Sequence, residues 1–272
     1  AMALDISQAA NAAKSHTMVK AAKSGEDLKD CEVIVITAGI PRKPGMSRDD
    51  LLLTNAKIMQ AVLEDIKKYA PNSKIIIVSN PLDAMVYAAL KILKFPREHV
   101  IGMAGILDSA RMSHFICEKL GYGAGQIESS VMGGHGDAMV PLVNYSTVAG
   151  VSLPELLSKE DIEDIVTKTK NGGLQIVKLL ETGSAYYAPA HATSLMVEAI
   201  LYNNKKIYPC SVMLDGEYDC KNVVSGVPVM LGSNGIEKII ELKLNEEQKE
   251  LFANSVASVQ ELIDTLDEKF FI

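Results

Sequence analysis

Runs of β-branched residues alternate with amphipathic stretches over the first hundred residues of the chain. Val33–Thr37 (VIVIT) and Ile75–Val78 (IIIV) are continuous apolar runs, typical of strands buried on both faces. Between them, Asp49–Tyr69 has apolar residues at helical spacing. Leu82–Leu93 is a second predicted helix, and Val100–Met103 is a third short strand. This alternation predicts βαβ units, and therefore a doubly wound parallel sheet with helices on both faces.

The pattern changes near Ile106, where we place a domain boundary. Residues 1–106 are predicted to form the α/β domain and residues 107–272 an α+β domain, a division that suits a chain of 272 residues. The helices expected in the second part are Asp108–Leu120, Lys159–Glu181, His191–Tyr202 and Asn245–Lys269, and the main strand candidates are Pro209–Leu214 and Val227–Leu231.

The stretch Val131–Pro141 (VMGGHGDAMVP) places one histidine, His135, among three glycines. Glycine tolerates backbone angles that other residues refuse, so such a loop can bring a side chain close to a ligand. Histidine titrates near neutral pH and can take or give a proton there. Taken alone, the stretch is more simply a turn that contains a histidine, because glycine-rich turns are common. The case for function depends on the residues expected around it.

Polar residues gather where the predicted strands end. In open parallel sheets, ligands bind beyond the carboxyl ends of the strands. The residues at these ends are Thr37, Ala38, Gly39, Arg42, Lys43, Arg48, Ser79, Asn80, Asp108 and Arg111. His135 also ends a predicted strand, so the sequence predicts an active site at this edge of the sheet.

Asp108 and Arg111 are three residues apart at the start of one predicted helix, so they share a face. A helix cap and a surface ion pair are the simpler explanations for the two. If they are functional, we expect them to have separate partners. Asp108 would accept a hydrogen bond from a ring nitrogen of His135, and Arg111 would bind a carboxylate through two hydrogen bonds.

Residues 41–48 (PRKPGMSR) form a loop with three cations, Arg42, Lys43 and Arg48. Loops of this kind can close over a substrate and expel water, although plain solvation is the commoner reason for a basic loop. Two arginines on the loop and Arg111 beneath it predict a small substrate with more than one negative charge.

Composition argues against several other classes of function. The chain has 27 basic and 34 acidic residues and no basic block, so nucleic acid is not an expected partner. Its four cysteines are far apart and form no C-x-x-C pair, which argues against a zinc site or a disulfide framework, and no metal is expected. We find no apolar run of membrane-spanning length and no signal peptide, so we expect a cytoplasmic protein with no membrane partner.

Five stretches carry a specific resemblance to a known family. They are TAGIPRKPGMSRDDLLLTNAKI, VSNPLDAM, GMAGILDSARM, GGHGDAMVPL and TGSAYYAPA. In this order they resemble NAD-dependent malate dehydrogenases, in the lactate-dehydrogenase-like branch of the lactate/malate dehydrogenase family. The resemblance implies a Rossmann-like NAD-binding domain followed by a substrate domain. It also implies hydride transfer that interconverts (S)-malate and oxaloacetate, a small dicarboxylate pair.

The resemblance implies a role for each site residue. His135 would be the general acid/base, Asp108 its orienting partner, and Arg111 the residue that binds the carboxylate next to the reacting carbon. Arg48 would polarise the carbonyl, and Arg42 would pair with the distal carboxylate, where lactate-specific members typically have glutamine. Asn80 would contact the substrate, and the residues expected along the NAD site are Thr37, Ala38, Gly39, Asn55, Val78, Ser79 and Asn80.

The 272 residues contain no counterpart of the family's opening strand, its G-x-G-x-x-G turn or its ribose-binding aspartate. The glycines of Gly121–Gly125 have the wrong spacing and follow a predicted helix. We therefore expect an N-terminally incomplete sheet in which the edge of Val33–Thr37 lacks its usual partner. We also expect weak or no activity from this polypeptide alone, and the choice between NAD and NADP is not fixed by the residues present.

The resemblance further implies a homodimer or homotetramer, for which Asp49–Tyr69 offers one candidate partner face. Two alternatives remain open at this point. One is a dehydrogenase for another 2-hydroxy acid, such as lactate, against which Arg42 argues. The other is a non-catalytic binding or assembly subunit, which the missing glycine-rich turn would favour.

Overall fold

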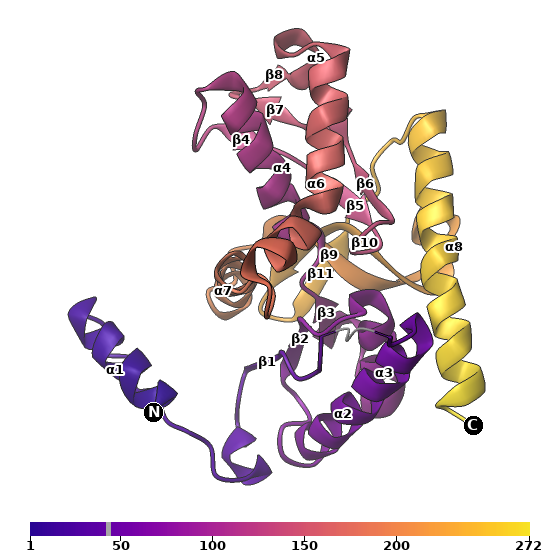
Figure 1. The fold of residues 1–272 in the computed structure, drawn as a ribbon. Helices are drawn as coiled ribbons and strands as arrows, with labels where there is room; N and C mark the ends of the chain where they lie inside the picture. Colours follow the sequence, from indigo (N-terminus) through magenta and orange to yellow (C-terminus); the bar gives the residue numbers. More distant parts are fainter. Residues whose placement is uncertain (42–44) are drawn as a thin grey trace.

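A computed structural model of the chain describes residues 1–41 and 45–272. Within them, six strands form the central sheet in the order β1-β2-β3-β9-β10-β11 (Figure 1). The strands are β1 Val33–Ile36, β2 Lys74–Ile77, β3 Val100–Gly102, β9 Lys206–Asp215, β10 Lys221–Gly232 and β11 Gly235–Ile239. The first three are parallel, which confirms the predicted α/β architecture. The last three are antiparallel and join the sheet where Gly102 pairs with Ser211, so one sheet runs through both parts of the chain.

Helices cover both faces of this sheet, as the continuous apolar strands predict. In β2, Ile75 and Ile77 pack in one core with α2 (Arg48–Tyr69), α3 (Leu82–Leu93) and α8 (Glu246–Lys269). Ile76 points to the opposite face and packs in a second core with α4 (Gly105–Leu120) and α7 (Tyr187–Leu201). Successive strand residues point to opposite faces, so the uninterrupted isoleucines are what a sheet covered on both sides requires.

A third, smaller core lies above the sheet around α4 and α6 (Lys159–Leu180), where Met112 and Ile116 pack against Ile165 (Figure 1). The short elements here are β4 Ile127–Glu128, β5 Val131–Gly133, β6 Met139–Pro141, β7 Thr147–Val148, β8 Val151–Ser152 and α5 Leu153–Leu156. Single-turn 3-10 helices occupy Gly25–Leu28, Arg97–His99, Val143–Tyr145 and Glu217–Asp219. This region carries α4 and the β5–β6 ribbon, which bear most of the candidate catalytic residues.

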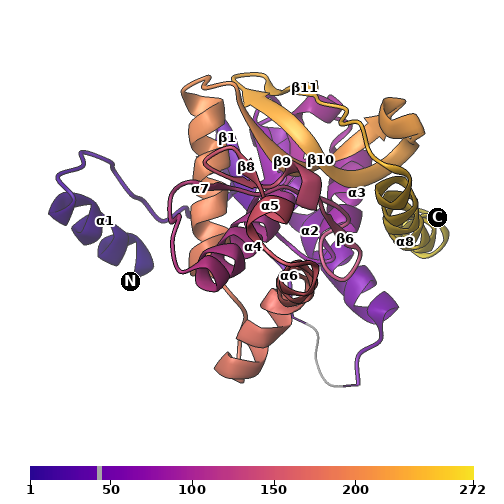
Figure 2. The same cartoon turned by 90° about the horizontal axis from the view of Figure 1, so that it is seen from above.

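The N-terminal helix α1 (Met2–Ala12) stands apart from the rest of the molecule in both views (Figures 1 and 2). It buries no residue, and its Met2, Leu4 and Ile6 side chains are exposed.

In the described part of the chain β1 is the edge strand of the sheet, and Val35 on it is 38% exposed. Among the described residues, no helix combines the length and the apolar character needed to cross a membrane.

Candidate active site

His135 lies at the tip of a two-stranded ribbon formed by β5 and β6, in which Gly133 pairs with Met139. Gly133 has a φ of +82°, and a Cβ on it would lie 2.7 Å from Ser255 Oγ. A side chain at this position would therefore be strained and would collide with α8. Glycine is therefore required at position 133, where the backbone comes close to α8.

The His135 side chain is hydrogen-bonded to a buried carboxylate. Its Nδ1 lies 2.8 Å from Asp108 Oδ2, and the two side chains are 14% and 2% exposed. Asp108 is held in the first turn of α4, at the end of β3, so the parallel sheet positions the acid and the ribbon positions the base. The predicted contact between Asp108 and His135 is present in the structure.

Arg111 contacts the same carboxylate, which differs from the separate partners that we expected. Its Nη1 donates to Asp108 Oδ1 over 3.0 Å, because the spacing of three residues on α4 brings the two groups together. One carboxylate thus orients both the imidazole and the guanidinium. Arg111 Nε is buried without a hydrogen-bond partner among the described residues. The guanidinium therefore keeps donors beyond those that Asp108 uses.

Two consecutive glycines in α6 make room for the Arg111 side chain. A Cβ on Gly172 would lie 3.2 Å from Arg111 Cδ, and one on Gly173 would lie 3.4 Å from Arg111 Nη2. Glycine inside a helix costs about 1 kcal/mol relative to alanine, so a pair of them in α6 is unfavourable for the helix alone. The arginine uses the space that they leave.

The surroundings of His135 favour its charged form. Burial disfavours the imidazolium, but the charge and hydrogen bond of Asp108, with a smaller contribution from the charge of Asp83, outweigh burial and the repulsion from Arg111. The net effect raises the pKa of His135 above its ordinary value. The ring therefore stays protonated to a higher pH than a free histidine, which suits a group that gives a proton near neutrality.

The loops after β1 and β2 are tied to each other by two buried side chains. Asn55 accepts a hydrogen bond from Ile40 N (2.8 Å) and donates to Asn80 O (2.6 Å). Ser79 Oγ donates to Ala38 O over 2.6 Å. Asn55 and Ser79 therefore hold these two loops together, and their place along the cofactor site stays a prediction.

The surface that these loops present consists of the other predicted residues. Thr37, Gly39 and Asn80 are exposed, and Val78 is half-buried. They lie at the carboxyl ends of adjacent parallel strands, where a ligand has access to the sheet edge. The apolar Val78 side chain could pack against the flat ring of a nicotinamide cofactor, and the polar groups beside it could hydrogen-bond to the amide of that ring.

Of the three cations in the predicted basic loop, the structure describes only Arg48. Arg48 is the first residue of α2, and its side chain is 55% exposed, with Nη1 4.0 Å from Glu261 Oε2 on α8. In the described part of the chain it makes none of the contacts that join His135, Asp108 and Arg111. Arg42 and Lys43 lie outside the described residues.

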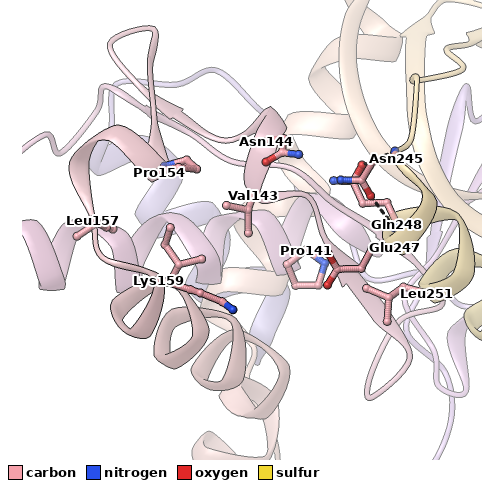
Figure 3. A pocket seen from close by; sticks show the side chains of 11 residues that line it. Pro141, Val143, Asn144, Pro154, Leu157, Lys159, Asn245, Glu247, Gln248 and Leu251 are labelled. Carbon is pink, nitrogen blue, oxygen red and sulfur yellow. Dashed lines mark hydrogen bonds between the residues drawn. The ribbon is translucent and has the colours of Figure 1, made fainter.

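A cavity of about 380 Å³ lies away from this group, between the end of β6, the α5–α6 connection and the start of α8 (Figure 3). It is lined by Pro141, Val143, Asn144, Pro154, Leu157, Lys159, Ile162, Asn245, Glu247, Gln248 and Leu251. None of the predicted site residues is among them. Within the described residues, no cluster of histidine, cysteine and acidic side chains is arranged to hold a metal ion.

Sequence reasoning missed three side chains that contact the histidine loop or its supports. Asp83 accepts a hydrogen bond from His135 N, Ser255 accepts one from Gly134 N, and Ser211 donates to Asp83. These partners are separated by 52, 121 and 128 positions in the chain. Only the DA of the NPLDAM stretch, directly after a predicted strand end, could have directed attention to Asp83.

Comparisons with known proteins show the family to which the chain belongs. Residues 1–102 match the lactate/malate dehydrogenase NAD binding domain, and residues 106–270 match the lactate/malate dehydrogenase alpha/beta C-terminal domain. Curated malate dehydrogenases of Aliarcobacter butzleri and Sulfurimonas denitrificans are 61% and 63% identical, over 100% and 99% of this chain and 86% and 85% of the relatives. The apo malate dehydrogenase of Picrophilus torridus superposes with a TM-score of 0.96 at 42% identity, covering 99% of this chain and 86% of that one. A Cryptosporidium parvum lactate dehydrogenase, solved with lactic acid and NAD, superposes with a TM-score of 0.93 at 38% identity, covering 97% and 85%.

Proposed function

Because the chain belongs to the lactate/malate dehydrogenase family, we propose that His135, Asp108 and Arg111 form its catalytic centre. The chain is an NAD-dependent oxidoreductase that interconverts (S)-malate and oxaloacetate. Its identity to curated malate dehydrogenases extends over nearly all of its length, which argues against a purely structural subunit. The observation that supports the assignment of the centre is the 2.8 Å contact between the imidazole and the buried Asp108 carboxylate.

In this proposal the residues of the centre divide the work of one proton transfer. Asp108 accepts from Nδ1 of His135, so Nε2 is left to take the proton of the 2-hydroxyl in oxidation and to return it in reduction. The imidazolium that forms is stabilised by the adjacent carboxylate. When bound, NAD would supply the acceptor for the hydride that leaves the substrate carbon, and the hydride donor in the reverse direction. The exposed Thr37, Gly39 and Asn80, together with Val78, are the residues that we propose to hold it.

The arginines would bind the two carboxylates and the reacting carbonyl. Arg111 has donors left beyond its contact with Asp108, which supports its role at the carboxylate next to the reacting carbon. For Arg48 we propose polarisation of the carbonyl, with Asn80 as a further substrate contact. Arg42 would pair with the distal carboxylate of malate and oxaloacetate. A substrate without that group would leave a guanidinium desolvated and unpaired, so its rejection should be strong.

We expect Arg42→Gln to move the preference of the enzyme from oxaloacetate toward pyruvate. Losing one charged bidentate partner should lower kcat/KM for oxaloacetate by about a hundredfold, with a smaller change or a gain for pyruvate. The measurement is the ratio of the two kcat/KM values in the same buffer. Lys43→Gln, which removes an equal charge from the neighbouring position, serves as the control and should leave that ratio nearly unchanged. An unchanged ratio in Arg42→Gln would contradict the proposed specificity and reopen the lactate-type alternative.

We also propose that the chain assembles with copies of itself, as a homodimer or homotetramer. Exposed apolar side chains support a partner surface on α1 and on the second half of α6, where Leu174 is 54% and Leu179 is 77% exposed. The helix α2 (Asp49–Tyr69 in the sequence prediction) buries Leu52, Met59 and other apolar residues in the core, and its outer face stays a candidate partner surface. Light scattering is expected to give two or four times the mass of one chain, and a monomer at micromolar concentration would contradict the proposal.

For its location we propose the cytoplasm. The four cysteines are all free thiols, as is usual in a reducing compartment: Cys31, Cys117, Cys210 and Cys220. Recovery of the protein in the membrane or extracellular fraction of its source cells would contradict this proposal.

A further inference from the structure

Asp83 is a buried carboxylate beside the catalytic loop that the proposed mechanism does not use. It lies in the first turn of α3, three residues after Asn80, and is only 4% exposed. Burying a carboxylate is costly unless its oxygens are well hydrogen-bonded, so a residue of this kind needs an explanation. Its contacts give one.

Both carboxylate oxygens of Asp83 have a donor, and the donors come from different parts of the fold. Oδ2 accepts a hydrogen bond from the backbone N–H of His135 over 2.8 Å. Oδ1 accepts one from Ser211 Oγ over 2.6 Å. Ser211 is itself buried in β9, directly opposite Gly102 of β3. The carboxylate therefore joins α3, the central sheet and the histidine loop at one point.

The loop is held at the next residue as well. The N–H of Gly134 donates to Ser255 Oγ of α8 over 2.7 Å, so two consecutive backbone N–H groups are held by side chains from two helices. Asp108, from α4, holds the ring of the same histidine. Backbone and side chain of His135 are thus fixed from different sides, each by a carboxylate. This is the arrangement expected where a proton must be delivered to one place.

We propose that Asp83 is a positioning residue, which holds the backbone of His135 and ties the acid/base to the loop that follows β2. We place the cofactor at that loop, which includes Val78 and Asn80. Asp83 would therefore hold the group that transfers the proton at a fixed position relative to the cofactor that transfers the hydride. The inference rests on the proposed role of His135. It assigns to Asp83 no contact with the substrate.

The charge of Asp83 also acts on the ring. The charged groups that face His135 are Asp108 and Arg111 from α4 and Asp83 from α3, while α8 and β9 contribute the uncharged Ser255 and Ser211. On the loop itself Asp137 is exposed. Burial raises the pKa of Asp83, against the hydrogen bonds from Ser211 and His135, which favour its ionised form. Its charge in turn adds to the effect of Asp108 in raising the pKa of His135.

Two substitutions separate the hydrogen bond from the charge. Asp83→Ala removes the acceptor for His135 N and should lower kcat by about ten- to a hundredfold, with KM for oxaloacetate changed by less than about threefold. Asp83→Asn can still accept from His135 N through its amide oxygen and approach Ser211 through its NH2 group. It should therefore restore kcat to within about fivefold of the unaltered chain at its own optimum. Without the negative charge, that optimum for oxaloacetate reduction should lie at lower pH.

The second readout does not depend on turnover. An NMR titration of the His135 ring without cofactor should give a lower pKa in Asp83→Asn than in the unaltered chain. Ser255→Ala, which removes the uncharged tether at Gly134, is the control and should leave the ring pKa in place. An unchanged ring pKa would show that the charge of Asp83 does not act on the ring. If Asp83→Ala fails to fold, Asp83→Asn still decides the positioning role, because a kcat lowered by more than about fivefold at its own pH optimum would overturn it.

The kinetic outcomes distinguish failure of this proposal from failure of the catalytic assignment. Two outcomes would overturn the positioning role of Asp83: a folded Asp83→Ala with unchanged kcat, or an Asp83→Asn that is as impaired as Asp83→Ala. If His135→Asn is inactive, either outcome overturns the role of Asp83 alone. An active His135→Asn would instead overturn the role of His135, and the role of Asp83 with it. Loss of kcat in Asp83→Ala with recovery in Asp83→Asn supports the proposal.

Discussion

Replacing His135 by asparagine is expected to lower kcat in both directions by about 10²- to 10⁴-fold, the usual contribution of a positioned general acid/base. Asparagine is close to histidine in size and can still hydrogen-bond to Asp108, but it cannot take or release a proton near neutral pH. The loss should therefore appear in kcat, with a smaller change in KM. The measurement is the steady-state rate of NADH formation from malate and of NADH consumption with oxaloacetate.

A matched control is present on the same helix as Asp108 and Arg111. His114 is exposed on α4 and makes a ring contact with Phe115, and it has no hydrogen bond to Asp108, Arg111 or His135 among the described residues. His114→Asn should leave kcat within about twofold of the unaltered chain, as is typical of a surface substitution. If His135→Asn retains activity within about tenfold, the assignment of His135 as the acid/base is wrong.

Local pattern was sufficient for the parallel part of the sheet. Ile75, Ile76 and Ile77 are all fully buried, with alternate residues in two different cores, which is why an unbroken apolar run predicts a strand covered on both faces. Ser47 caps α2 through a capping box with Asp50, a local signal that the sequence itself carries. In these elements the local sequence and the tertiary environment favour the same structure.

Two of the antiparallel strands, β9 and β10, were predicted in the right places but too short, and β11 was not predicted. β9 extends over Lys206–Asp215 and β10 over Lys221–Gly232, each with a proline inside the strand. Proline lacks an N–H and usually marks the end of a strand. Here Pro209 lies opposite Pro228, so the two residues share one position of the ladder. Such pairing depends on the register of two strands and cannot be recognised in either strand alone.

The sequence identified which residues gather at the candidate site, but it did not predict all of the hydrogen bonds between them. The spacing of Asp108 and Arg111 indicated a shared helix face, but local sequence did not indicate that both the arginine and the histidine would bond to one carboxylate. Ser79 was correctly placed at a strand end and Asn55 was expected near the cofactor site, but local sequence did not indicate that their polar groups would bond to backbone atoms of the loops. These partners come from distant segments, and only the folded chain brings them together.

Replacing Asp108 by asparagine is the substitution with the largest expected effect after that of His135. The carboxylate accepts from His135 Nδ1 through one oxygen and from Arg111 through the other, and an amide has only one oxygen. If that oxygen faces Arg111, the NH2 group faces Nδ1, which then must accept, and the proton moves to Nε2. The tautomer that can take the substrate proton is lost, and kcat for malate oxidation should fall by about 10²- to 10³-fold. If the amide is turned the other way, Arg111 loses its acceptor and KM should rise.

The pH dependence identifies the cause of that loss. Asp108 raises the pKa of His135, so removing its charge should lower that pKa. The protonated ring, which oxaloacetate reduction requires, would then persist only at lower pH, and the descending limb of kcat/KM for reduction should move to lower pH. Asp137→Asn removes an exposed carboxylate two residues from His135 and should leave the profile in place. If the profiles of Asp108→Asn and the unaltered chain coincide, the charge of Asp108 does not control the proton on His135, and the site works by some other arrangement.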